Sequence, residues 1–146
     1  MDVKNKRVVV TGAASGIGKA LCEAFYQAEV KSIVAVDMNL EGAQETADSV
    51  EGIAIQANVG SEEDIINVIQ KADEHAGGID IFCSNAGIGG VPGFFEVEAS
   101  DWQNIWEVNV QSHIFAAKHV LPQMIERGEG YLVNTSSAAG LLTQLG

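Results

Sequence analysis

The stretch Thr11-Gly12-Ala13-Ala14-Ser15-Gly16-Ile17-Gly18 decides the fold, because it separates two segments with different hydrophobic periods. The β-branched run from Arg7 to Val10 precedes it and is typical of a buried strand. The segment after it has helical spacing, with one apolar face formed by Ile17, Leu21, Phe25 and Ala28. Such a turn lets a pyrophosphate approach the backbone and aims helix N–H groups at it. The stretch therefore predicts a dinucleotide-binding turn.

The same alternation of apolar runs and helical segments continues along the chain. Further buried strands are expected at Ser32 to Val36, Ile53 to Val59, Ile79 to Ser84 and Tyr131 to Thr135. Strands that alternate strictly with helices predict right-handed crossovers and a parallel sheet. The fold class is therefore α/β, with one domain over residues 1–146.

Three features predict how the later helices begin and end. Ser61 with Asp64 resembles a capping box, and Ser100 with Gln103 predicts the start of a long helix toward Ile125. Pro122 is expected to kink or interrupt that helix because proline lacks an amide hydrogen. A glycine-rich loop reaching Gly93 is expected before the long helix.

Composition and charge exclude several classes of partner. Eight Lys and Arg against 20 Asp and Glu give a formal net charge of −12, so nucleic acid and anionic membranes are not expected partners. The longest early apolar run, Val8-Val9-Val10, is too short for a signal peptide or a membrane span. Cys22 and Cys83 fall in apolar patterns and are interpreted as small buried residues in a reducing compartment, so a cytoplasmic location is expected.

Asp37 points to the cofactor. It ends the second predicted strand, nineteen residues after Gly18, where a carboxylate accepts hydrogen bonds from ribose hydroxyls and repels a 2′-phosphate. Neither residues 13–15 nor residues 38–39 include an Arg or Lys to attract such a phosphate. NAD is therefore predicted over NADP. The alternative interpretation of Asp37 is a helix N-cap or an ordinary loop acid.

Other site chemistries fit the residues less well. A Walker A loop has four residues between its first glycine and Gly-Lys, whereas Gly12 precedes Gly18-Lys19 by one residue too many, and Ala20 has no hydroxyl for magnesium. The wide glycine spacing also fits an S-adenosylmethionine site poorly. No metal site is expected, because the three histidines, His75, His113 and His119, lack the spacing that directs two imidazoles at one ion.

Four motifs together resemble the classical short-chain dehydrogenases/reductases. They are the Thr-Gly-x-x-x-Gly-x-Gly of residues 11–18, Asn85-Ala86-Gly87, Asn109 and Ser136-Ser137, and they occur in the family's order over essentially the whole chain. The resemblance implies a Rossmann-type doubly wound parallel sheet with strand order 3-2-1-4-5. The C-terminal strands and helices of that family are expected to be absent, so the domain is expected to be the incomplete N-terminal portion of a longer chain.

The resemblance also implies which residues hold NAD. The pyrophosphate would be held by Gly12, Ser15, Gly16, Ile17 and Gly18. Asp37 would hold the adenosine ribose, and the adenine would be flanked by Met38, Asn58 and Val59. The cleft and the nicotinamide ribose would be lined by Asn85, Ala86 and Gly87. The family more often has Asp at position 58, but an amide oxygen can still accept from the adenine amino group, so binding is expected to survive.

The catalytic residues implied by the resemblance are Ser137, which would orient the substrate carbonyl, and Asn109, which would belong to a proton relay. Ser136 is the competing assignment, and no G-x-S-x-G surrounds either serine. From its place between Val108 and Val110, Asn109 is otherwise interpreted as a satisfied polar residue inside a helix. The family's Tyr-x-x-x-Lys is expected beyond Gly146, and no such motif occurs within the chain.

These observations predict an NAD-dependent oxidoreductase of a secondary alcohol or ketone as the longer chain, with the 146 residues alone expected to be inactive. A homo-oligomer is the family-level expectation for the full-length protein. The alternative is a non-catalytic NAD-binding module or pseudoenzyme.

Overall fold

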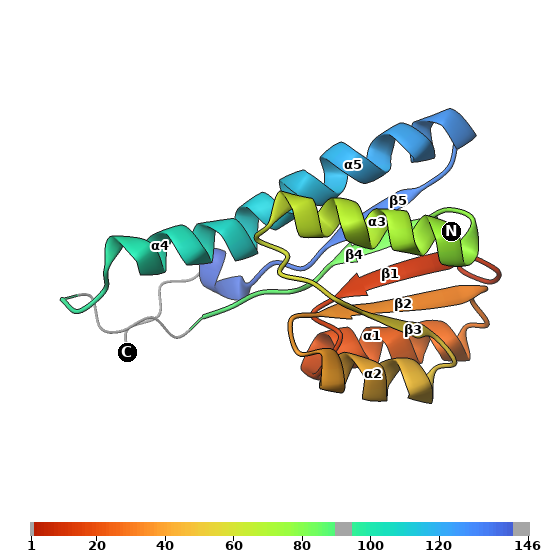
Figure 1. Cartoon of the computed structure of the whole chain (residues 1–146), viewed down its shortest axis with the longest axis horizontal. Coiled ribbons are helices and arrows are strands. Elements are labelled where there is room, and N and C mark those ends of the chain that lie inside the picture. Colours follow the sequence, from red (N-terminus) through yellow and green to blue (C-terminus); the bar gives the residue numbers. More distant parts are fainter. Residues whose placement is uncertain (1, 90–94, 142–146) are drawn as a thin grey trace.

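The computed structural model describes residues 2–89 and 95–141, in which strands and helices alternate (Figure 1). The loop predicted to reach Gly93 therefore lies partly outside the described residues. The strands are β1 (Arg7–Thr11), β2 (Ser32–Asp37), β3 (Ile53–Gln56), β4 (Ile81–Ser84) and β5 (Tyr131–Asn134). The helices are α1 (Gly16–Gln27), α2 (Leu40–Ser49), α3 (Glu62–Ala76), α4 (Ala99–Trp106) and α5 (Ser112–Arg127), with a π-helical segment η1 (Glu107–Gln111) and a 3-10 helix η2 (Ala138–Gly140).

All strand pairs are parallel, and the sheet has the order β3-β2-β1-β4-β5. This confirms the predicted fold class and strand order. Helices α1 and α2 cover one face of the sheet, and α3 and α5 cover the other (Figure 1). The sheet is therefore doubly wound. The carboxyl ends of its parallel strands lie at the same edge, which is where ligands of such sheets bind.

Successive residues of each central strand pack into different halves of the core. Val9 and Phe82 belong to the cluster beneath α3 and α5, whereas Val8 and Cys83 belong to the cluster beneath α1 and α2. Because both faces are covered, the strands appear in the sequence as nearly continuous apolar runs. Cys22 and Cys83 are buried, as predicted, and burial raises the pKa of each thiol to about 12.

The third strand is shorter than predicted, because it ends at Gln56 instead of Val59. After Gln56 the backbone forms a loop with local hydrogen bonds. The Asn58 N–H donates to Asp64 Oδ2 at 2.8 Å, and the Ser61 N–H donates to the Asn58 carbonyl at 2.9 Å. The Ser61 hydroxyl caps α3 by accepting from the Asp64 N–H. Since the Asp64 carboxylate accepts from Asn58, only half of the predicted capping box forms.

The predicted long helix begins and breaks at other residues than expected. Its capping box is formed by Glu98 and Asp101, so Ser100 lies within the first turn and does not begin the helix. Pro122 lies inside α5 without ending it, and the change in helical geometry occurs earlier, at η1. Pro122 is exposed, so water can solvate the backbone carbonyl that its missing N–H leaves unbonded.

Charged side chains close the amino edge of the sheet. Asp80 is only 7% exposed and receives Arg7 on both carboxylate oxygens, with Nη2 to Oδ1 at 2.5 Å and Nε to Oδ2 at 2.8 Å. The Arg7 backbone N–H donates to Oδ2 as well, at 2.9 Å. Arg127, at the end of α5, lies 4.0 Å from Oδ1. The Arg7 guanidinium hydrogen bonds hold the pKa of Asp80 below its ordinary value, despite burial.

Candidate active site

Two adjoining cavities lie at the carboxyl edge of the sheet. The larger, of about 870 Å³, is lined by predicted residues that include Ile17, Asn85, Asn109, Ser136 and Ser137. The smaller, of about 130 Å³, is lined by Gly12, Asp37, Met38, Asn58 and Val59. Both cavities share Ala86, Gly87 and Ile88. The structure therefore brings most of the predicted site residues into one continuous cleft.

The three glycines of the first turn have different surroundings. Gly12 has a φ of +71°, and a Cβ there would lie 2.9 Å from the Ala86 Cα. A Cβ on Gly18 would lie 2.0 Å from the Gly12 carbonyl oxygen. Gly16 has a φ of +53°, yet a Cβ there would meet no described atom within 4 Å. Gly12 and Gly18 thus allow the turn to pack against the protein, whereas Gly16 faces open space.

The N-terminus of α1 is suited to an anion. Its N-cap, Ser15, makes no side-chain capping hydrogen bond, and the first turn of the helix contains no acidic residue. In contrast, α2 is capped by the Asn39 side chain, and α3 is capped by Ser61 and has three acidic residues in its first turn. Ser15, Gly16 and Ile17 are exposed. The positive end of the α1 dipole therefore faces solvent beside the cleft.

Asp37 ties the end of β2 to the glycine turn. Its Oδ2 accepts the Ala14 N–H at 3.0 Å, and its Oδ1 accepts the Asn39 N–H at 2.9 Å. Asn39 is the N-cap of α2, so the alternative interpretation of Asp37 as that helix's cap is wrong. Each carboxylate oxygen has a further lone pair for a ligand hydroxyl. Beside it, the apolar side chain of Met38 is 60% exposed at the rim of the smaller cavity.

A hydrogen-bond network that the sequence analysis missed fixes Asn85. The Thr11 hydroxyl accepts the backbone N–H groups of Asn85 and Ala86 at 2.9 and 3.1 Å. The Asn85 amide donates to the Thr11 carbonyl and accepts from the Thr135 hydroxyl, both at 3.0 Å. This joins β1, β4 and the end of β5. Thr11 carried a usable signal, because a polar residue directly after three buried valines requires partners.

Asn109 lies in the π-helical segment η1, so its predicted place in a regular helix is corrected. The Ile88 N–H donates to Asn109 Oδ1, and Asn109 Nδ2 donates to the Ile88 carbonyl, both at 2.8 Å. This reciprocal pair fixes the backbone immediately after Asn85-Ala86-Gly87. A π-helical turn adds a residue to the local repeat and is frequent at functional sites. Asn109 is thus a satisfied polar residue that shapes the cleft wall.

The two serines lie beyond β5 on the wall of the larger cavity. Ser137 Oγ accepts the Ala139 N–H at 3.1 Å and caps η2. Because this bond uses the oxygen as acceptor, the Ser137 hydroxyl hydrogen stays available to a ligand. His113, which the sequence analysis did not assign to the site, also lines this cavity, and its Nδ1 lies 3.0 Å from Asn134 Oδ1.

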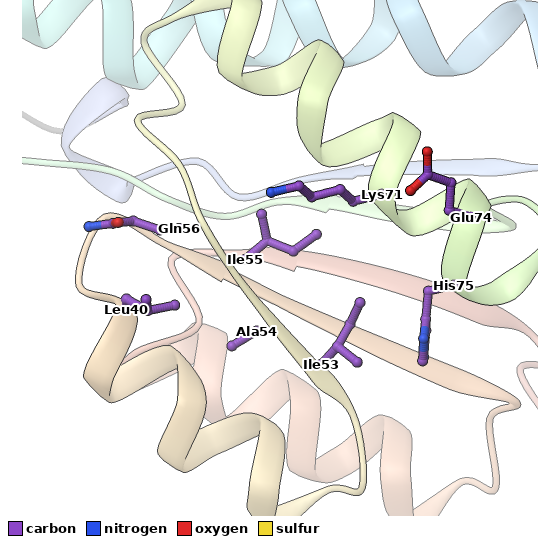
Figure 2. A pocket seen from close by; sticks show the side chains of 8 residues that line it. All are labelled: Leu40, Ile53, Ala54, Ile55, Gln56, Lys71, Glu74 and His75. Carbon is purple, nitrogen blue, oxygen red and sulfur yellow. The ribbon is translucent and has the colours of Figure 1, made fainter.

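A separate hollow lies away from this cleft, on the outer strand β3 (Figure 2). Figure 2 shows Leu40 of α2 on one side of the strand and Lys71, Glu74 and His75 of α3 on the other. None of the predicted site residues line it. Over residues 2–89 and 95–141, no group of three or more His, Cys, Asp or Glu side chains is placed to hold a metal ion. Within those same ranges, no helix is long and apolar enough to cross a membrane.

Comparisons with known proteins show the family of this chain. The family model for short chain dehydrogenases matches residues 6–146. Glucose 1-dehydrogenase 2 of Bacillus subtilis (strain 168) is 32% identical over 143 residues, covering 93% of this chain and 55% of the relative. Cyclohexanol dehydrogenase of Acinetobacter sp. (strain SE19) is 33% identical over 144 residues, covering 94% and 57%.

A solved structure is also similar to this chain. The short chain dehydrogenase/reductase from Burkholderia phymatum, crystallised in complex with NAD, superposes with a TM-score of 0.93 and 28% identity, covering 99% of this chain and 53% of the other. The chain belongs to the short-chain dehydrogenase/reductase family, whose members include the dehydrogenases named above. It spans little more than half the length of these relatives.

Proposed function

We propose that this chain is the NAD-binding part of an oxidoreductase that transfers hydride between nicotinamide and a secondary alcohol or ketone. The observation that carries the proposal is the glycine turn, where the open space at Gly16 adjoins an uncapped helix N-terminus. Asp37 lies at the next strand end and is tied to the same turn through Ala14. An anionic pyrophosphate and a ribose diol are the ligand groups that fit these two features.

The proposed cofactor contacts divide along the cleft. Ser15, Gly16 and Ile17 bind the pyrophosphate through the first N–H groups of α1, while Gly12 and Gly18 allow the turn its close packing. Asp37 accepts from the ribose hydroxyls and disfavours a 2′-phosphate, which supports NAD over NADP. The adenine lies against Met38, Asn58 and Val59 in the smaller cavity. The nicotinamide ribose lies against Asn85, Ala86 and Gly87 in the larger cavity.

The proposed substrate end is the wall that carries the serines. Bound NAD supplies the nicotinamide carbon that exchanges hydride with the substrate. Ser137 donates its hydroxyl hydrogen to the substrate oxygen, because its own oxygen is fixed by Ala139. Asn109 keeps the adjoining loop in place through Ile88 and is proposed to take part in proton relay. The Tyr-x-x-x-Lys that completes proton transfer in this family does not occur among the 146 residues.

The cofactor proposal is tested by titrating the protein with NADH and NADPH and following nicotinamide fluorescence. We expect NADH to bind more tightly, and Asp37→Asn to weaken NADH binding by roughly tenfold, the scale of one hydrogen bond to a charged group. Glu45→Gln is the matched control, because Glu45 is an exposed acid on α2, the helix that follows Asp37, and lines neither cleft cavity. Tighter binding of NADPH, or no binding of NADH, would contradict the proposal.

The catalytic proposal needs a second assay. A longer protein that carries a Tyr-x-x-x-Lys after residue 146 is assayed with a panel of secondary alcohols. Ser137→Ala is expected to reduce turnover while NADH affinity stays unchanged, and Ser136→Ala serves as the adjacent control. If Ser136→Ala abolishes turnover and Ser137→Ala does not, Ser136 is the serine that orients the substrate oxygen. NADH binding without turnover on any alcohol would favour the non-catalytic module.

A further inference from the structure

Asn58 lines the smaller cavity, and hydrogen bonds hold its backbone in place. Its backbone N–H donates to Asp64 Oδ2 at 2.8 Å, and its carbonyl accepts the Ser61 N–H at 2.9 Å. The cavity is also lined by Val59 and Val108, each 6% exposed. The site thus offers apolar contacts for a flat ring and a fixed amide for the ring's polar edge.

The orientation of the Asn58 amide follows from its other neighbour. Asn58 Oδ1 accepts the Gly60 N–H at 3.0 Å, and a backbone N–H requires an acceptor, so the oxygen and not the nitrogen lies on that side. Within the described part of the chain, Asn58 Nδ2 makes no hydrogen bond. The residue therefore presents a free donor, Nδ2, beside an oxygen that has one lone pair left.

We propose that Asn58 makes this site tolerant of the group at carbon 6 of the purine, so that dinucleotides carrying adenine or hypoxanthine bind with similar affinity. The inference rests on the proposed function, because it assumes that the smaller cavity takes the base of NAD. Adenine presents an amino donor at this position, which Asn58 Oδ1 accepts. Hypoxanthine presents a carbonyl acceptor there, to which Asn58 Nδ2 donates.

A carboxylate at position 58 would behave differently. It would still accept the Gly60 N–H, so the turn would keep its hydrogen bond, but it would present no donor to a 6-oxo purine. Asp37 lines the same cavity, and Asp64 contacts the Asn58 backbone. A third negative charge in this region would face the hypoxanthine carbonyl oxygen, whereas the adenine amino group would be attracted to it. Asn58→Asp therefore removes the donor that the proposal depends on and adds a charge, and both changes disfavour hypoxanthine relative to adenine.

The test compares NADH with reduced nicotinamide hypoxanthine dinucleotide, both followed by nicotinamide fluorescence on the same protein. The wild type is expected to bind the two within about threefold. Asn58→Asp is expected to shift the ratio of dissociation constants by at least about tenfold toward NADH, the scale of one hydrogen bond replaced by a repulsive contact. Asn104→Asp makes the same chemical change at an exposed position on α4 and is expected to leave the ratio unchanged.

The outcomes separate this inference from the proposed function. A wild-type preference for NADH above about tenfold would overturn the inference alone, and this measurement does not depend on any variant folding. The inference would also be overturned if the ratio of the two dissociation constants were the same in the wild type and in Asn58→Asp, with circular dichroism showing that the variant is folded. Failure of both dinucleotides to bind the wild type would overturn the proposed function and the inference with it.

Discussion

Replacing Asp80 by Asn is expected to destabilise the fold by about 2 to 3 kcal/mol at pH 7. Asp80 is 7% exposed, and its two oxygens accept three hydrogen bonds from Arg7. In the variant, one carboxylate oxygen becomes an NH2 group that faces a guanidinium donor, so at least one charge-assisted bond is lost. This expected loss of stability lies near the lower end of the range for removing one partner of a buried ion pair, because the Arg7 side chain remains 18% exposed.

The assay is urea unfolding followed by circular dichroism, at several pH values. The pKa of Asp80 is lowered in the folded state, so the charge stabilises the fold above the unfolded pKa, and this contribution is lost as pH falls through the folded pKa. The difference between wild type and Asp80→Asn should therefore be largest at neutral pH and should shrink in acid. Glu45→Gln, which removes the same charge from an exposed position, is the control. Equal free energies of unfolding for the two variants at pH 7 would refute the reasoning.

Three further predictions concern the turn, the thiols and the cleft loop. Gly16→Ala is expected to weaken NADH binding because its Cβ would enter the open space proposed for the pyrophosphate, and to destabilise the fold by about 1 kcal/mol through strain at a φ of +53°. Gly18→Ala would force α1 away from the Gly12 carbonyl, and it is expected to lower the free energy of unfolding in urea by about 3 kcal/mol. The buried thiols of Cys22 and Cys83, each with a pKa raised to about 12, are expected to react with a disulfide reagent at pH 8 only on unfolding. Asn109→Ala is expected to accelerate hydrogen exchange at the Ile88 amide, measured by NMR, because that amide loses its acceptor.

The sequence was sufficient for the central strands and the glycine turn because both depend on local patterns, whereas the strand order was implied by the family resemblance. Apolar runs marked the central strands, and the change of period at the turn marked α1. The end of β3 was predicted too late because Val59 is buried although it lies outside the strand. Burial of a loop residue and burial in a strand give the same apolar letter in a sequence, so periodicity alone does not distinguish them.

The parts of the site that escaped sequence analysis depend on contacts between distant residues. Nothing local links Thr11 to Asn85 and Thr135, yet their hydrogen bonds join three strand ends. Asn109, in the π-helical segment, likewise pairs with Ile88, twenty-one positions away. Only the family resemblance marked Asn109 as significant, and the structure supplies a physical reason for an asparagine at that position.

The two edges of the sheet present different polar groups, and this contrast bears on function. At the amino edge, Asp80 and Arg7 saturate each other, and Arg127 lies against them, so this edge holds the fold together. At the carboxyl edge, the first N–H groups of α1 are uncapped and Asn58 Nδ2 is without a partner among the described residues. These groups are exposed, so water satisfies them until a ligand takes its place. The exposed N–H groups of α1 and the Asn58 amide nitrogen are therefore available to a ligand with acceptor groups, whereas the Asp80 and Arg7 groups are not.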